Sequence, residues 1–148
     1  MTVRVYIGAS SSEIDRVRAA EALLRAKLPE VEFLSTWPDD VEALGDPNPR
    51  DASDGERSEM AYGCLRRVDR ADIFWFLVPP VDVPTRGAWC ELDRANGRKI
   101  PCVASGDTKQ SVFCALALET LTDELGAYWV AHIATTLRRL YAPEDAHG

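Results

Sequence analysis

The sequence predicts a doubly wound α/β fold with a parallel sheet of four or five strands flanked by helices. Short apolar segments alternate with segments of helical periodicity along the 148 residues. The run at 71–78 (ADIFWFLV) is apolar throughout, as in a strand that helices cover on both faces. The composition, 46% hydrophobic and 28% charged, is that of a globular protein. The length is that of one domain, spanning residues 1–148.

The chain begins with a predicted strand and helix. Residues 3–8 (VRVYIG) are rich in β-branched and aromatic side chains, which favours a strand, and three serines follow closely. A helix is expected next, because Ser12 and Asp15 resemble a capping box and apolar residues then recur at helical spacing up to Pro29. A second short strand is predicted over 31–37 (VEFLSTW).

The middle of the chain is acidic and then amphipathic. Residues 38–55 hold three prolines, two glycines and six acidic residues, which predicts a long acidic loop, either a solvated insertion or a lid over the site. Residues 56–70 place apolar side chains on one stripe and charges on the other, which indicates a helix. The stripe consists of Met60, Cys64, Leu65 and Val68.

The second half continues the alternation after the central strand at 71–78. A helix is predicted over 87–96 with Gly97 as its C-cap, and an edge strand over 99–104, where Pro101 cannot donate to a sheet. Residues 110–140 are helical by pattern, and 141–148 form a polar tail. The expected core contacts of the C-terminal helices are Val112, Leu116, Leu121, Leu125, Trp129, Ile133 and Leu137.

Charge and composition exclude several function classes. A net charge of -7 argues against a nucleic-acid partner, which would require clustered cations. No apolar stretch has a membrane-spanning length and the N-terminus lacks a signal-peptide pattern, so we expect a cytoplasmic protein without a membrane partner. With two histidines and no CxxC pair, we expect no metal and no cofactor. The cysteines are expected to be small buried hydrophobes: Cys64, Cys90, Cys102 and Cys114.

The carboxyl ends of the strands are the expected place for a ligand. The segment 8–12 offers backbone N–H groups and hydroxyls at a helix start, and 79–87 leads into the helix of Glu91. Glu91 is expected in the first helical turn, where the helix dipole keeps a carboxylate ionised. Such a carboxylate either acts at the anomeric carbon of a sugar or simply complements the dipole at the surface.

Three segments resemble a known family. "VYIGAS" in the first predicted strand, "RADIFWFLV" at the central one and "RGAWCELDRANGRKIPCV" after it resemble the nucleoside 2-deoxyribosyltransferase superfamily, which includes the 2'-deoxynucleoside 5'-phosphate N-hydrolases. The resemblance covers roughly residues 3–104, apart from 38–55. It implies a flavodoxin-like α/β fold, a homodimer, and cleavage of the bond between a deoxyribose and its base in a small nucleoside or nucleotide.

The resemblance also implies roles for particular residues. The family's catalytic glutamate falls on Glu91, where it attacks or stabilises C1' of the sugar. Its first-strand tyrosine falls on Tyr6, whose hydroxyl is expected to reach that glutamate or the sugar. The small residues after the strand fall on Gly8 and Ala9, next to Ser10, which is expected to bind substrate.

The loop before Glu91 departs from the transferases. Six residues before the glutamate, where they carry an aspartate and the monophosphate hydrolases a serine, this chain has Thr85, followed by Arg86 and Gly87. A hydroxyl beside a cation suits a phosphate, so a nucleoside 5'-monophosphate is the favoured substrate. Trp89 is the best candidate for stacking on the base, although packing is the commoner role of a tryptophan.

Cys64 is the second departure, since both branches of the family carry an aspartate at this position. A thiol does not do the work of a carboxyl group on a leaving base, so altered or absent activity is one expectation. Carboxylates that could substitute are Glu59, Asp69 and Asp82.

Two other functions stay open at this point. The opening "VYIGASSSE" with the later "AWCEL" also resembles TIR-like nucleotide-binding domains, some of which cleave NAD. A non-catalytic nucleotide-binding or sensing module is the third possibility, motivated by Cys64.

Overall fold

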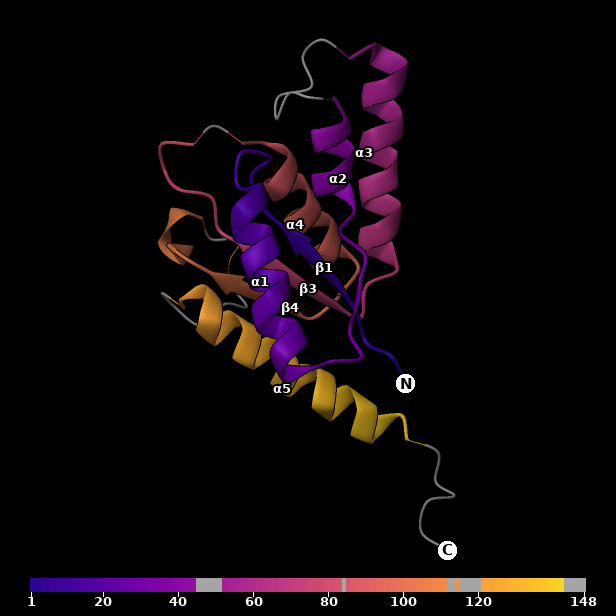
Figure 1. Ribbon diagram of the computed structural model, residues 1–148, viewed down its shortest axis with the longest axis vertical. Helices are drawn as coiled ribbons and strands as arrows, with labels where there is room; N and C mark the ends of the chain where they lie inside the picture. Colours follow the sequence, from indigo (N-terminus) through magenta and orange to yellow (C-terminus); the bar gives the residue numbers. More distant parts are fainter. Residues whose placement is uncertain (45–51, 84, 112–113, 115–120, 143–148) are drawn as a thin grey trace, which may run out of the picture.

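The sheet of this protein is parallel and has the strand order β2-β1-β3-β4 (Figure 1). The structure is a computed structural model that describes residues 1–44, 52–83, 85–111, 114 and 121–142. The α/β class with a parallel sheet is confirmed, with four strands among these residues. The strands are β1 (Arg4–Gly8), β2 (Glu32–Phe33), β3 (Ile73–Leu77) and β4 (Cys102–Ser105).

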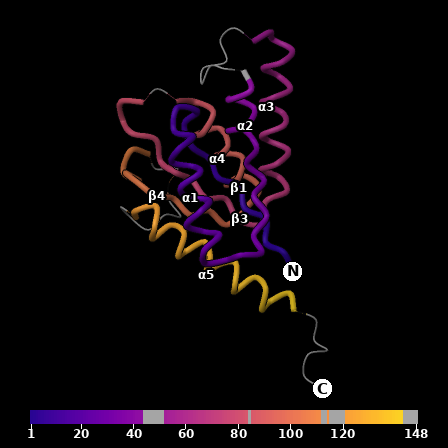
Figure 2. Tube along the Cα trace, in the orientation of Figure 1, coloured from indigo at the N-terminus to yellow at the C-terminus, as the bar shows by residue number. Residues whose placement is uncertain are grey.

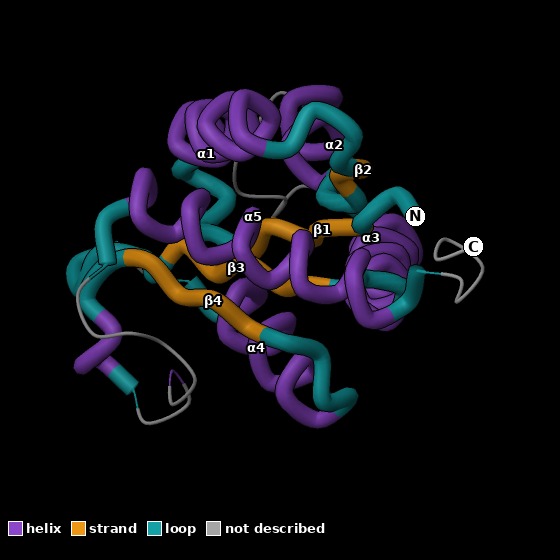
Figure 3. The backbone as a smooth tube through the Cα atoms, turned by 90° about the horizontal axis from the view of Figure 1, so that it is seen from below, coloured by secondary structure: helices purple, strands orange, loops and turns teal. Residues whose placement is uncertain are grey.

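Helices cover both faces of the sheet. Figure 3 shows α1 and α4 on opposite sides of the strands. Helix α5 packs against α1 and covers β3 and β4, while α4 contacts β1, β3 and β4 and packs against α3. The path of the chain in Figure 2 brings α2 and α3 side by side. The helices are α1 (Ile14–Lys27), α2 (Trp37–Leu44), α3 (Asp54–Asp69), α4 (Gly87–Gly97) and α5 (Asp123–Leu140), with a 3-10 turn η2 (Thr108–Gln110).

Strand β3 is the centre of the core, as its uninterrupted apolar sequence predicted. All five of its residues are buried, and it pairs with β1 on one side and β4 on the other. Strand β4 lies at the edge of the sheet, as Pro101 indicated. The Trp75 indole N–H, which needs a partner when buried, donates to Ser105 Oγ at 2.9 Å.

The prediction of a loop over 38–55 is wrong at both of its ends. Residues Trp37–Leu44 form α2, because Trp37 and Val41, one helical turn apart, are both buried against the core. The Trp37 indole donates to the Ile7 carbonyl at 3.1 Å, which ties this helix to β1. Pro38 is tolerated because the first turn needs no N–H from it. The burial of Trp37 and Val41 thus stabilises a helix here, although the acidic composition of the segment predicted a loop.

The other end of the predicted loop is a helix start. Ser53 and Glu56 form a reciprocal capping box, so α3 begins at Asp54. Residues 45–51 of the predicted loop lie outside the described residues. The capping box predicted at Ser12 and Asp15 is wrong, since α1 has Glu13 at its N-cap with no side-chain capping bond and Ser12 bonds to Ser10 instead.

Several element boundaries also differ from the prediction. Strand β2 is reduced to Glu32–Phe33, and β4 begins at Cys102 because Pro101 before it lacks an N–H. Helix α4 includes Gly97, with Arg98 as its C-cap.

The C-terminal helix is rotated relative to its predicted core face. Helix α5 buries Gly126, Ala127, Val130 and Ala134, so the small residues face the sheet. Leu125 is consequently 48% exposed, which contradicts its predicted core contact. Leu121 is buried, and Trp129, Ile133 and Leu137 pack at the edge of the core. Val112, Leu116 and most of the predicted tail, residues 143–148, lie outside the described residues.

The cysteines only partly follow the expectation. Cys102 and Cys114 are buried, Cys64 is partly buried, and Cys90 is exposed on α4 because α4 turns Ala88 and Leu92 toward the sheet instead. Among the described residues, no helix has the length and apolar character required to cross a membrane.

Candidate functional site

A tyrosine and a glutamate from different elements meet beside the sheet. Tyr6 lies in the middle of β1 and Glu91 lies on α4. The Tyr6 hydroxyl donates to Glu91 Oε1 over 2.8 Å. The Tyr6 side chain is fully buried, and its ring stacks on Phe74 of β3 with centroids 5.7 Å apart and planes inclined by 7°. Packing therefore fixes the direction of the donor.

The position of Glu91 follows from how α4 packs on the sheet. Ala88, Leu92 and Ala95 are buried at helical spacing, and Glu91 lies next to this stripe. It is the fifth residue of the helix, so the prediction of a first-turn position is wrong. The residue as a whole is partly buried, while its carboxyl group lies deep enough for burial to dominate its ionisation.

The helix-dipole argument predicted that the Glu91 carboxyl is held ionised. This prediction is wrong. Burial raises its pKa to about 7, although the Tyr6 hydroxyl and the Cys64 thiol both favour the anion by hydrogen bonding. Desolvation outweighs the dipole here because Glu91 lies beyond the first turn, where the dipole acts most strongly. Near neutral pH both the protonated and the ionised forms of Glu91 are therefore populated.

The Tyr6 hydroxyl stays protonated. Burial, and then the negative charge of Glu91, raise the pKa of Tyr6 well above its ordinary value. A phenol in this environment acts as a hydrogen-bond donor to Glu91 and not as a proton acceptor.

Gly8 makes room for the glutamate at the carboxyl end of β1. A Cβ atom at this position would lie 2.7 Å from Phe74 Cζ and 3.2 Å from Glu91 Oε2. The close approach of backbone to carboxylate therefore requires a glycine. Oε2, the oxygen that Tyr6 does not contact, faces this part of β1.

Cys64 lies on α3, the helix that packs along α4. Its side chain is partly buried against the hydrophobic core. Burial, with the charge of Glu91, raises the thiol pKa to about 11, so the group is a neutral thiol at physiological pH.

The three carboxylates that the sequence offered in place of Cys64 are engaged or exposed. Asp69 accepts two hydrogen bonds of 2.7 Å from Arg94. Glu59 and Asp82 are exposed.

The predicted substrate-binding loops follow two neighbouring strands. Ser10 is buried, with its hydroxyl 3.0 Å from Ser12 Oγ, and Ala9 beside it is buried as well. After β3, Thr85 is partly buried and Arg86 is exposed. Because β1 and β3 are adjacent parallel strands, both loops leave the same edge of the sheet.

The start of α4 remains open to solvent. Arg86 is the N-cap residue but makes no side-chain capping bond, and Gly87 is exposed. Trp89 packs edge-on against Phe76, with ring centroids 4.9 Å apart. This contact gives Trp89 a packing role within the helix–sheet interface.

The likeness of this chain to known proteins lies in its structure. No protein-family model matches the chain, and no curated protein matches it. The chain is similar in structure to the CMP N-glycosidase BcmB of Clostridium botulinum. The identity is 12%, the TM-score is 0.49, and the match covers 90% of this chain and 98% of that one. At this identity no residue role is carried over from that enzyme.

Sequence reasoning missed an arginine that joins four elements near this edge. Arg16 of α1 donates to the Val78 carbonyl at 2.9 Å and to the Ser105 carbonyl at 3.3 Å, just beyond β3 and at the end of β4. It also pairs with Asp123 at the start of α5, at 2.8 and 2.9 Å. Nothing in the spacing of α1 distinguishes Arg16 from a solvent-facing charge.

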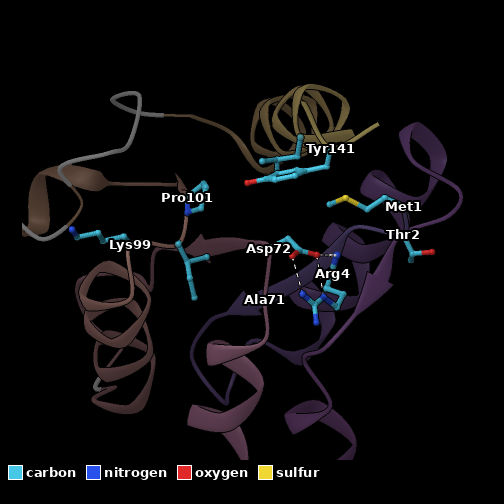
Figure 4. A pocket seen from close by; sticks show the side chains of 10 residues that line it. Met1, Thr2, Arg4, Ala71, Asp72, Lys99, Pro101 and Tyr141 are labelled. Atoms are coloured by element: carbon cyan, nitrogen blue, oxygen red, sulfur yellow. Dashed lines mark hydrogen bonds and ion pairs between the residues drawn. The ribbon is translucent and has the colours of Figure 1, made fainter. Parts of the chain in front are cut away.

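A groove of about 750 Å³ lies at the opposite end of the strands (Figure 4). Its polar centre is the pair of Arg4 and Asp72, joined by two side-chain hydrogen bonds of 3.1 and 3.0 Å. Both charges are thus already neutralised. The groove lies at the amino ends of β1 and β3, away from the loops that converge beyond their carboxyl ends. Among the described residues, no cluster of side chains could hold a metal ion.

Proposed function

We propose that this protein cleaves the N-glycosidic bond of a nucleoside, a deoxynucleoside or the corresponding 5'-monophosphate, with Glu91 acting at C1'. One observation carries the proposal: the hydrogen bond of 2.8 Å from the buried Tyr6 hydroxyl to Glu91 Oε1. It turns Oε2 toward Gly8 at the carboxyl end of a parallel strand.

The proposed chemistry uses the ionised form of Glu91. Oε2 forms a bond to C1' while the bond from C1' to the base nitrogen breaks, and the bonding electrons leave with the base, which takes a proton from solvent. Water, or the nitrogen of a second base, then attacks C1' and releases the carboxylate. The first acceptor gives hydrolysis and the second gives transfer. Tyr6 holds the carboxylate in one orientation throughout.

The loops support a phosphorylated substrate. Ser10 and Thr85 offer hydroxyls, and Arg86 offers an exposed cation at the uncapped start of α4. The N-terminus of a helix attracts anions, and a guanidinium binds phosphate oxygens in pairs. These groups would hold the 5' end of the nucleotide while C1' faces Glu91.

The test is release of free base from a defined set of compounds. The panel contains ribonucleosides, deoxynucleosides, their 5'-monophosphates and NAD, analysed by chromatography. We expect the monophosphates to react fastest and Glu91→Gln to abolish release, whereas Glu59→Gln, at an exposed glutamate of α3, leaves it unchanged. Equal base release by Glu91→Gln and the parent protein rejects this role for Glu91. Release of nicotinamide alone would assign the site to NAD cleavage.

A second candidate is a nucleotide-binding module without turnover. The thiol of Cys64 favours this function. With a pKa of about 11, the thiol is too weak an acid to protonate a leaving base. Thermal stabilisation by a nucleoside monophosphate with no base released would select this function.

A further inference from the structure

Helix α5 turns one side to the sheet and the opposite side to solvent. Its buried side contacts α1, β3 and β4. In Figure 1 the helix lies along the lower edge of the molecule, with α1 and the sheet above it. Its exposed side chains recur every three or four residues, so they share one side of the helix, which we call the outer face. The outer face consists of Glu124, Leu125, Tyr128, His132, Thr135, Thr136 and Arg139.

The middle of the outer face carries no charge. Between Glu124 and Arg138 the sequence has no Asp, Glu, Lys or Arg, although 28% of the residues in the chain are charged. A helix side that meets only water is ordinarily charged or polar, whereas the core of a protein interface is depleted of charge. Leu125 and Tyr128 are nevertheless 48% and 53% exposed here. Such a surface is typical of an interaction site.

The threonines of the outer face have their hydroxyl groups satisfied within the helix. The Thr135 hydroxyl donates to the Ala131 carbonyl at 2.9 Å, and the Thr136 hydroxyl donates to the His132 carbonyl at 3.1 Å. Both hydroxyls therefore turn back to the helix backbone. A partner that covers these two side chains breaks neither bond, so their burial carries a small polar cost.

Aromatic rings along α5 hold one another in place. Tyr128 and Trp129 make an edge-to-face contact with centroids 5.7 Å apart, and Trp129 makes a contact of the same length with His132. Trp129 is itself partly buried against the core, so it supports the two exposed rings. Side chains that are ordered beforehand lose little conformational entropy when a partner covers them.

The two ends of the outer face carry opposite charges. Glu124 lies in the first turn of α5 and Arg139 in the last, about 22 Å apart along the axis at 1.5 Å per residue. Their neighbours Asp123 and Arg138 form ion pairs within the chain, whereas no ion pair of the described residues involves Glu124 or Arg139. The outer face is therefore complementary to itself when two copies meet with antiparallel α5 helices.

We propose that the outer face of α5 binds the same face of a second copy of this protein, with the two helices antiparallel about a two-fold axis. The axis lies halfway between Glu124 and Arg139, so Glu124 of each copy lies opposite Arg139 of the other. It also brings Tyr128 of each copy close to Thr135 of the other, in the uncharged middle of the interface. The net charge of -7 opposes association of two copies elsewhere on the surface. The interface does not depend on the activity proposed above.

The first experiment measures the mass of the protein in solution by analytical ultracentrifugation between about 1 and 100 µM. The parent protein is expected to pass from the chain mass of 16.4 kDa to twice that mass as the concentration rises. A single species of 16.4 kDa over the whole range overturns the proposal.

The second experiment places a charge in the middle of the interface. Tyr128→Glu is expected to weaken dimerisation at least about tenfold, because the added carboxylate would lose its water without gaining a partner. Tyr62→Glu, at a tyrosine of α3 that is 64% exposed, changes the net charge equally and is the matched control. Both positions are exposed, so neither variant disturbs the core, and circular dichroism checks the fold. Equal dimerisation of the two variants overturns the proposal.

The third experiment tests the antiparallel arrangement by exchanging charges. Glu124→Arg and Arg139→Glu each place like charges opposite one another at both ends of the interface. Each is expected to weaken dimerisation about threefold to tenfold at low salt. The double variant restores opposite charges at both ends and is expected to dimerise like the parent protein. If the two losses add up in the double variant, Glu124 and Arg139 do not face each other and the antiparallel arrangement is overturned.

Discussion

Tyr6 and Glu91 are 85 positions apart in the sequence and are joined by a hydrogen bond of 2.8 Å between the hydroxyl and Oε1. The tyrosine is immobilised by stacking on Phe74, so the bond constrains the glutamate more than the tyrosine. Four predictions follow from this pair and from the packing around it.

Removing the hydroxyl should impair the site without disturbing the fold. Tyr6→Phe keeps the ring that stacks on Phe74 but loses a hydrogen bond to a charged group, an interaction of about 1.5–3 kcal/mol. We expect kcat/KM to fall about 10-fold to 100-fold at neutral pH, with the ascending limb of the pH profile moved to higher pH. Steady-state kinetics across pH 5–9 measures both effects. Tyr62→Phe, at an exposed tyrosine of α3, is the matched control, and a profile for Tyr6→Phe that equals this control contradicts the role of Tyr6.

The ionisation of Glu91 should make the free energy of unfolding, as well as the activity, depend on pH. Its folded-state pKa of about 7 lies above its ordinary value of 4.5, so the folded state binds the proton more tightly than the unfolded state. The free energy of unfolding therefore loses this contribution as pH rises from about 4.5 to 7. The full loss is on the order of 3 kcal/mol.

Glu91→Gln should accordingly be inactive yet more stable than the parent protein at pH 8, with a much smaller gain at pH 4.5. Urea unfolding at the two pH values measures the difference. A gain that is the same at both pH values would show that burial does not raise the Glu91 pKa.

Gly8→Ala tests the close approach of the backbone to the site. The added methyl group meets the Phe74 ring at 2.7 Å and Glu91 Oε2 at 3.2 Å, so one of them must move. We expect a loss of stability of about 1–3 kcal/mol together with a loss of activity of at least about tenfold. Gly97→Ala at the end of α4 is the control, since a methyl group there meets nothing within 4 Å. Wild-type activity in Gly8→Ala would contradict the geometry described for Glu91.

Gly126→Ala tests the contact of α5 with the sheet. A Cβ atom here would overlap Ser105 Oγ and lie 2.7 Å from Trp75 Nε1, which are themselves hydrogen-bonded. We expect the free energy of unfolding to fall by about 1–3 kcal/mol, as measured by thermal or urea unfolding. The titration of Glu91 should stay unchanged, because α5 packs mainly against α1, β3 and β4 and not against α4. Stability equal to that of the parent protein would contradict this packing.

Local signals in the sequence were sufficient to place the central strand β3 and the edge strand β4 in the sheet. The apolar run around Trp75 predicted a central strand because a strand covered on both faces has no polar side, and Pro101 predicted the edge position of β4 because it lacks an N–H. Helix α2 was missed because it is stabilised by the burial of Trp37 and Val41 and by the bond from Trp37 to the Ile7 carbonyl of β1, which are tertiary contacts that composition does not reveal.

The contact between Tyr6 and Glu91 was predictable, but the ionisation of Glu91 was not. The resemblance brought Tyr6, Gly8 and Glu91 into one hypothesis, and the three residues do lie together. The ionisation expected for Glu91 was wrong, because desolvation depends on how α4 packs on the sheet and cannot be derived from helix position.

The contacts of Arg16 with Val78, Ser105 and Asp123 have a consequence for protein engineering. Arg16 binds the Val78 carbonyl after β3, and Ala88 packs α4 on the sheet. Both ends of the segment that connects β3 with α4 are therefore held in place by contacts outside that segment. The sequence of such a connecting segment can be changed while the elements at its two ends keep their positions. Libraries that vary positions 80–86, including Thr85 and Arg86, should therefore change which compounds are accepted while the pair of Tyr6 and Glu91 stays in place.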